Sequence, residues 1–162
     1  MTEADKLVDQ LERSFRGDPW YGSSVLTALE GLSAAQAARY PVAGAHSIWE
    51  LVIHMRAWKG EVLSRFQGHP AGTPSEGDWP DQPAAPTDAL WRDEVARLVR
   101  VHEGLVDAVR RSTAAHLNEG VVDQRNREAG TGLAQWQTVH GIVQHDVYHL
   151  GQISLLRKAA GA

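Results

Sequence analysis

Residues 47–66 decide the fold, and they read SIWELVIHMRAWKGEVLSRF. Ser47 and Glu50 have the spacing of a capping box, in which each side chain bonds a backbone N–H that the start of a helix leaves free. Apolar side chains then recur every three or four residues, which is the period of one helix face. The stretch therefore predicts a helix over residues 48–66 that ends near Gly68.

A proline-rich segment follows this helix. Prolines stand at positions 70, 74, 80, 83 and 86, and proline is excluded from helix interiors and central strands. A loop of this length needs a structural reason inside one domain. Because an extended chain spans about 3.3 Å per residue, the segment is long enough to run back along the whole helix. We interpret residues 68–86 as a crossover that joins two parallel helices.

The same period marks three further long helices, around residues 7–15, 91–109 and 136–156. Thr87 or Asp88 is expected to cap the second of these and Thr131 the third, because their side-chain oxygens accept hydrogen bonds from a first helical turn. The pattern predicts an all-α protein, a four-helix bundle with a long Pro-rich crossover between its second and third helices. A chain of 162 residues fits a single domain over residues 1–162.

Two shorter helical pieces are expected between the first two long helices. Asp18 and Pro19 have the residue types of a helix start, so we expect residues 25–29 to belong to the piece that follows them. Ser33 is expected to cap a short turn over residues 34–38. Residues 113–130 have an irregular pattern that supports no prediction.

Composition excludes several classes of protein. Sixteen Lys and Arg stand against 20 Asp and Glu, a net charge of -4, whereas a protein that binds nucleic-acid phosphates needs a basic face. The absence of Cys excludes disulfides, thiolate nucleophiles and Cys-based zinc sites. The sequence has no apolar run long enough to cross a membrane, and its charged N-terminus lacks a signal-peptide pattern. We expect a cytoplasmic protein that binds neither nucleic acid nor membranes.

Histidines supply the candidate chemistry. His145 and His149 lie four residues apart in the helix predicted over 136–156, so both side chains leave one face, one turn apart. Two imidazoles at this spacing can bind one metal ion at about 2.0–2.1 Å each. His54 is the best candidate for a third ligand, because it lies on the inward face of the helix over 48–66 and a buried imidazole needs a partner. Three His ligands leave a coordination position open, as catalytic metal sites do.

A less specific interpretation stays open, in which the three histidines are ordinary core or surface residues. A single H-x-x-x-H arises easily by chance in a chain with eight His. The chain lacks the Glu-x-x-His pairs of di-iron bundles and the H-E-x-x-H of zinc peptidases, which excludes those two sites. His46 lies about 12 Å of helical rise from His54, too far to share the ion. His102 is expected to be a hydrogen-bonded core residue rather than a fourth ligand.

Three neighbours of these histidines are candidate pocket residues. Trp58, one turn beyond His54, is a candidate for the wall of a pocket beside the metal, and core packing is the alternative. Gln152, one turn after His149, is a candidate for orienting a ligand or the substrate. Glu61, two turns beyond His54, is a candidate hydrogen-bond acceptor or general base, with a solvated helix charge as the alternative.

Three blocks of the sequence resemble the DinB superfamily, the DinB/YfiT-like metalloenzymes. They are GDPWYG at residues 17–22, HSIWELVIH at 46–54 with Trp58 beyond it, and HDVYHLGQI at 145–153. The last block contains H-x-x-x-H-x-G-Q, the most specific mark of the family. The resemblance implies an up-down-down-up four-helix bundle, a metal ion held by His54, His145 and His149, and a homodimer.

The resemblance also implies a range of activities. The family includes mycothiol- and bacillithiol-dependent S-transferases, a mycothiol-dependent maleylpyruvate isomerase and metal-dependent hydrolases. The leading hypothesis is that a divalent ion (Zn, Ni or Fe) binds a small thiol and lowers its pKa, so that the thiolate attacks a small-molecule electrophile. Two alternatives stay open: a hydrolase in which the ion carries the attacking water, and a non-catalytic, stress-associated bundle that binds metal.

Overall fold

The computed structural model describes residues 1–123 and 132–161, and the regular secondary structure of this part of the chain is helical, apart from two isolated bridges. Its helices are α1 (Glu3–Phe15), α2 (Val25–Leu29), α3 (Ala34–Ala37), α4 (Ile48–Phe66), α5 (Asp88–Arg111), α6 (Ala114–Asn118) and α7 (Gln135–Ala159). The predicted all-α class is confirmed for the described residues. None of these helices is long and apolar enough to cross a membrane.

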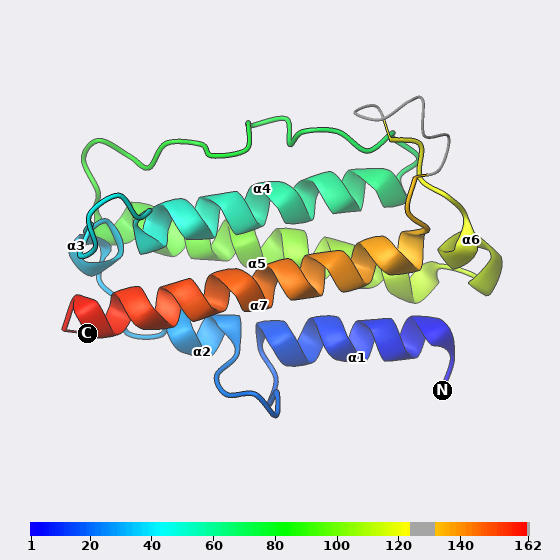
Figure 1. Ribbon diagram of the computed structural model, residues 1–162, viewed down its shortest axis with the longest axis horizontal. Helices are drawn as coiled ribbons and strands as arrows, with labels where there is room; N and C mark the ends of the chain where they lie inside the picture. The colour runs from blue at the N-terminus through cyan, green and yellow to red at the C-terminus, as the bar shows by residue number, and fades with distance from the viewer. Residues whose placement is uncertain (124–131, 162) are drawn as a thin grey trace.

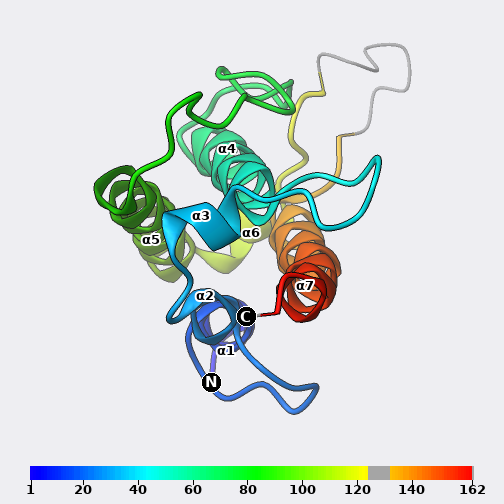
Figure 2. The ribbon, with the colours of Figure 1, turned by 90° about the vertical axis from the view of Figure 1, so that its left-hand side faces the viewer.

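The long helices α1, α4, α5 and α7 lie side by side (Figure 1). In that view α4 and α5 run from left to right, whereas α1 and α7 run from right to left. The end-on view shows α4 beside both α5 and α7, with α1 in contact with the same two helices on the opposite side (Figure 2). Between α4 and α5 the chain returns along the length of α4 as an irregular segment, which therefore connects two helices of the same direction.

The capping box at the start of α4 is confirmed. The Ser47 hydroxyl accepts a hydrogen bond from the Glu50 N–H at 3.1 Å, and the Glu50 carboxylate accepts one from the Ser47 N–H at 2.9 Å. The buried Ser47 hydroxyl also donates to Gln82 Oε1 at 2.7 Å, which ties the crossover to the first turn of α4. Ser33 and Thr87 cap α3 and α5 as expected.

Other helix starts differ from the prediction. The N-cap of α2 is Ser24, so the expectation that Asp18 and Pro19 begin this helix is wrong. A short helix, α6, lies in the stretch for which no prediction was possible, and the Thr113 hydroxyl caps it. The last helix begins at Gln135 after Ala134, and Thr131, its expected cap, lies outside the described residues.

A fully buried ion pair joins α4 to α7 in the centre of the bundle. Lys59 Nζ lies 2.5 Å from Asp146 Oδ2, and both side chains are 0% exposed. The Lys59 ammonium also lies 5.3 Å from the centre of the Phe15 ring on α1. The pair therefore connects three of the four long helices at one level of the bundle.

His102 on α5 stacks on the Phe15 ring. Its ring lies 3.8 Å from that of Phe15, and it is fully buried. Neither ring nitrogen has a hydrogen-bond partner among the described residues, so the expectation of a hydrogen-bonded core histidine is not met there. Burial, together with the charges of Lys59 and Arg16, lowers the pKa of His102 to about 2, which keeps the ring neutral.

Removing one partner of the central ion pair should be far more damaging than removing both. We expect Lys59→Met to lower the free energy of unfolding by about 3–5 kcal/mol, because Asp146 is then buried without a counter-charge. The double variant Lys59→Met/Asp146→Leu should recover most of this loss, because no charge remains to be desolvated. Urea denaturation followed by circular dichroism measures both values.

The exposed pair Asp107–Arg110 on α5 provides the control, because both side chains are 56% exposed. Asp107→Ala should change the free energy of unfolding by less than about 1 kcal/mol. A double variant at 59 and 146 that is no more stable than Lys59→Met would contradict the interpretation of the buried pair.

Candidate metal centre

The structure brings His54 of α4 together with His145 and His149 of α7. The Nε2 atom of His145 lies 3.0 Å from Nε2 of His54 and 3.1 Å from Nε2 of His149. One ligand atom from each ring lies within 4.8 Å of the others. Nitrogen atoms that share a zinc ion at about 2.0–2.1 Å each lie within about 4.2 Å of one another. Both distances from His145 Nε2 are within this limit, so the three rings lie close enough together to be candidate ligands of one ion.

Two of the rings are oriented by hydrogen bonds at their outer edges. Nδ1 of His54 donates to the backbone oxygen of Asp78 at 2.6 Å, and Nδ1 of His149 donates to Gln152 Oε1 at 2.7 Å. Both partners can only accept, so Nδ1 carries the proton in each ring, and in the neutral imidazole the lone pair lies on Nε2. Histidines that bind metals are held in this way, with the outer N–H on a carbonyl or carboxylate.

The protonation state of the cluster suits a cation. Burial lowers the pKa of His54 and of His149, and burial together with these two neighbours lowers the pKa of His145 to about 3. All three rings are then neutral at pH 7, the form in which imidazole binds a metal. A single proton on His145 Nε2 can bond only one of the two facing nitrogens at a time, whereas a divalent cation satisfies all three lone pairs. The residues present therefore fit a metal ion.

The crossover completes the site with two residues that the sequence did not reveal. The Asp78 carboxylate accepts a hydrogen bond from Trp58 Nε1 at 2.8 Å, while its backbone oxygen holds His54. The Trp79 ring stacks between His54 and His46, with centroid distances of 3.8 and 3.7 Å. The only sequence feature that could have indicated Trp79 is that it is an aromatic residue in a Pro-rich loop. His46 thus lies beyond Trp79, in agreement with the expectation that it does not share the ion.

The three candidate pocket residues have different surroundings. Trp58 lies beside the cluster, with its ring 6.4 Å from that of His54 and 6.3 Å from that of His145. Gln152 orients His149, as described above. The Glu61 carboxylate is held elsewhere, by the Gly72 N–H at 2.7 Å and by Arg65 at 2.5 Å. Glu61 thus anchors the crossover, and its role as a general base stays a prediction.

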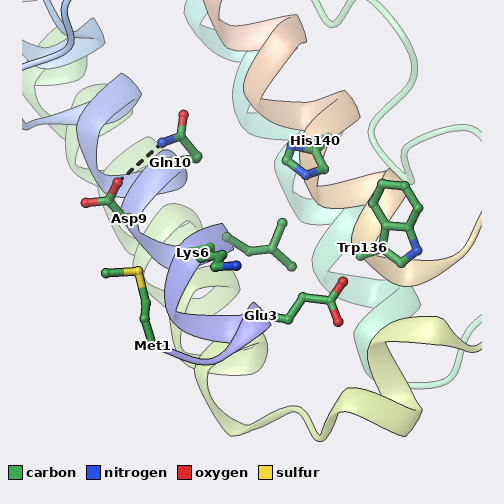
Figure 3. Close-up of a pocket in the computed structure, with 8 residues that line it drawn as sticks. Met1, Glu3, Lys6, Asp9, Gln10, Trp136 and His140 are labelled. Carbon is green, nitrogen blue, oxygen red and sulfur yellow. Dashed lines mark hydrogen bonds between the residues drawn. The ribbon is translucent and has the colours of Figure 1, made fainter.

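A separate groove of about 560 Å³ lies between α1 and the start of α7 (Figure 3). Trp136 and His140 form its α7 side, and Glu3 and Lys6 of α1 line it together with Met1, which precedes that helix. None of the three clustered histidines lines this groove. This groove is therefore separate from the histidine cluster between α4 and α7.

Comparison with known proteins adds one finding. The family model described as the DinB superfamily matches residues 22–153, a range that includes all three clustered histidines. Searches of the curated proteins and of the solved structures found no match to the chain.

The geometry predicts one transition-metal ion per chain. Protein purified without added metal or affinity nickel should contain about one ion per chain by elemental analysis, and His145→Ala/His149→Ala should contain none, because two of three ligands are lost. His140→Ala is the matched control, since this histidine lies on the same helix outside the cluster. Equal metal content in all three proteins would place the ion elsewhere.

Gln152 should affect the metal through His149. We expect Gln152→Leu to weaken metal binding by about 10- to 100-fold, because the acceptor that fixes the His149 ring is lost. Competition with a chromogenic chelator measures the dissociation constant. Gln144→Leu, on an exposed position of the same helix, should leave the constant unchanged. A similar weakening in both variants would show that Gln152 does not act by orienting His149.

Proposed function

The chain belongs to the DinB superfamily, and we propose that it is a divalent-metal-dependent enzyme that activates a small thiol at His54, His145 and His149. The observation that carries this proposal is the convergence of three Nε2 atoms, two of them on rings whose outer edges are fixed. A site with three protein ligands leaves room for a reactant, whereas structural zinc sites are closed by four. Zinc, nickel and iron all suit imidazole, so the ligand set does not select among them.

A divalent ion bound at these histidines supplies a positive charge that lowers the pKa of a thiol beside it. The chain's own residues hold and enclose this position. Asp78 and Gln152 fix two of the rings, and Trp58 and Trp79 limit the access of water on the crossover side. This arrangement keeps the imidazoles neutral and oriented before any reactant arrives.

The surroundings favour thiol activation over hydrolysis. Metal-dependent hydrolases of the H-E-x-x-H type place a carboxylate base beside the metal-bound water, but the described cluster contains only histidines. Asp78 approaches His54 from the Nδ1 side, at 3.5 Å, opposite the edge that faces the cluster. The Glu61 carboxylate is held by Gly72 and Arg65. A thiol, whose ordinary pKa is near 8.5, needs only a modest shift to ionise at neutral pH.

The proposal extends to the architecture. The opposite directions of α1 and α7 relative to α4 and α5, together with the crossover, support an up-down-down-up four-helix bundle (Figure 1). The cluster lies between α4 and α7, which run antiparallel. Each bundle therefore needs only its own two helices and crossover to form the cluster, whether or not the protein is a homodimer.

A thiol-consumption assay tests the activity. The metal-loaded protein, supplied with a small thiol and the electrophile monochlorobimane, should form the fluorescent conjugate faster than the metal-free protein does. Turnover of an ester or amide without any thiol would favour the hydrolase instead. No turnover with either substrate class would favour a non-catalytic metal-binding bundle.

The variant His54→Ala separates a catalytic ion from a structural one. We expect it to lose the metal and the conjugation activity but to keep the helical content and cooperative unfolding, because the bundle has a hydrophobic core of its own. Circular dichroism at room temperature provides the measurement. An unfolded His54→Ala protein would mean that the ion holds the fold together, which would weaken the enzyme proposal.

A further inference from the structure

A pocket of about 310 Å³ lies in the same gap between α4 and α7 as the histidine cluster. Its walls come from the loop before α4, the first turn of α4 and the C-terminal half of α7. The apolar side chains that line it are Val42, Ala45, Leu51, Leu155 and Leu156. Val42 is 40% exposed and Leu155 is 64% exposed. Apolar surface left open in a concave site is typical of a ligand pocket.

On both α4 and α7, the pocket residues lie on the same side of the cluster along the helix axes. On α4, Leu51 precedes His54 by three residues, and on α7, Leu155 follows His149 by six. Because α4 and α7 run in opposite directions, both steps lead toward the same end of the bundle (Figure 1). At 1.5 Å per residue the apolar wall lies about 5 to 10 Å from the histidines along the helix axes. The pocket therefore lies next to the cluster along the two helices, and its lining includes Gln152, which holds His149.

Polar groups of the pocket lie at the end that meets the cluster. Gln152 lines the pocket and also holds His149 through its Oε1 atom. No described residue accepts a hydrogen bond from the Gln152 amide nitrogen, which leaves two N–H donors for a ligand. His46 also lines the pocket and contacts Trp79, which covers His54.

The charge of the lining selects the kind of ligand. The described residues around the pocket include no Asp, Glu, Lys or Arg. The one titratable group, His46, has Glu50 at 3.2 Å as its partner. An ionised group placed here would lose its hydration without gaining a counter-charge. An uncharged hydrocarbon group would instead cover Val42 and Leu155.

We propose that this pocket seats an uncharged hydrocarbon group, aliphatic or aromatic, of the compound whose reactive group reaches the histidine cluster. The inference rests on the proposed function, because it is the ion at the histidines that places the reactive end of the compound. The pocket then determines specificity by the length and shape of the apolar end, and Gln152 connects the two parts of the site.

A series of alkyl thiols tests the proposal without any assay of activity. The protein is loaded with Co²⁺, whose ligand-field absorption reports metal binding, and is titrated with ethanethiol, 1-butanethiol and 1-hexanethiol. The thiolate-to-cobalt charge-transfer band gives a dissociation constant for each thiol. We expect binding to tighten about fourfold for each added methylene, the usual effect of burying one such group.

Two variants locate the effect. Leu155→Ser removes part of the apolar wall, and Ala45→Leu fills the pocket from the opposite side. In both variants the dissociation constant should depend less on the chain length of the thiol. The dissociation constant of ethanethiol should stay unchanged, because ethanethiol does not reach the pocket. Leu133→Ser is the matched control, since Leu133 is 58% exposed and lies outside the pocket.

The outcomes distinguish a failure of the proposed function from a failure of this inference alone. Absence of Co²⁺ binding would overturn the proposed function and this inference with it. Normal Co²⁺ and ethanethiol binding without dependence on chain length would overturn the inference alone. The inference alone would also be overturned if Leu133→Ser flattened the dependence on chain length as much as Leu155→Ser does. It would likewise be overturned if Leu155→Ser converted a dimer to a monomer without changing thiol binding, because a second copy of the chain would then occupy the pocket.

Discussion

The buried ion pair between Lys59 and Asp146 is the constraint on which the site depends. Both charges are fully removed from water, and the cost of that removal is of the same order as the attraction between them. The contribution of the pair therefore lies in alignment more than in net stability. Apolar contacts between α4 and α7 tolerate a shift along the axis, but a shift of one turn would leave two unpaired charges in the core. Only one register of the two helices therefore pairs the charges of Lys59 and Asp146.

That register places the histidines. Asp146 adjoins His145 in α7, and Lys59 lies five residues after His54 in α4, so the same alignment that pairs the charges brings the imidazoles together. The crossover then adds what the two helices lack. The Asp78 carbonyl fixes His54, and the Arg56 guanidinium, which is bonded to Glu76, holds the nearby part of this segment against α4. A segment without helical structure is thus kept in place by polar bonds to α4.

The sequence predicted those features that rest on local patterns. The Ser47 capping box, the helix period and the prolines of the crossover each depend on neighbours within a few residues, and so does the four-residue spacing of His145 and His149. Asp78 and Trp79 were missed because a loop has no period from which a side chain's direction follows. The burial of Lys59 was missed for a different reason. A helical lysine is normally solvated, and its burial becomes intelligible only once the position of Asp146 on another helix is known.

The core explains why the proposed metal site, with its open coordination position, is compatible with this fold. Small domains that need a metal to fold lack a sufficient hydrophobic core and use a closed set of four ligands. Here two clusters of buried apolar side chains extend over the bundle, with residues such as Leu11, Leu98 and Ile153 fully buried. The histidines lie between α4 and α7 and contribute little to that core. The core and the histidine cluster thus consist of different residues, which is compatible with the catalytic role proposed for an ion at the cluster.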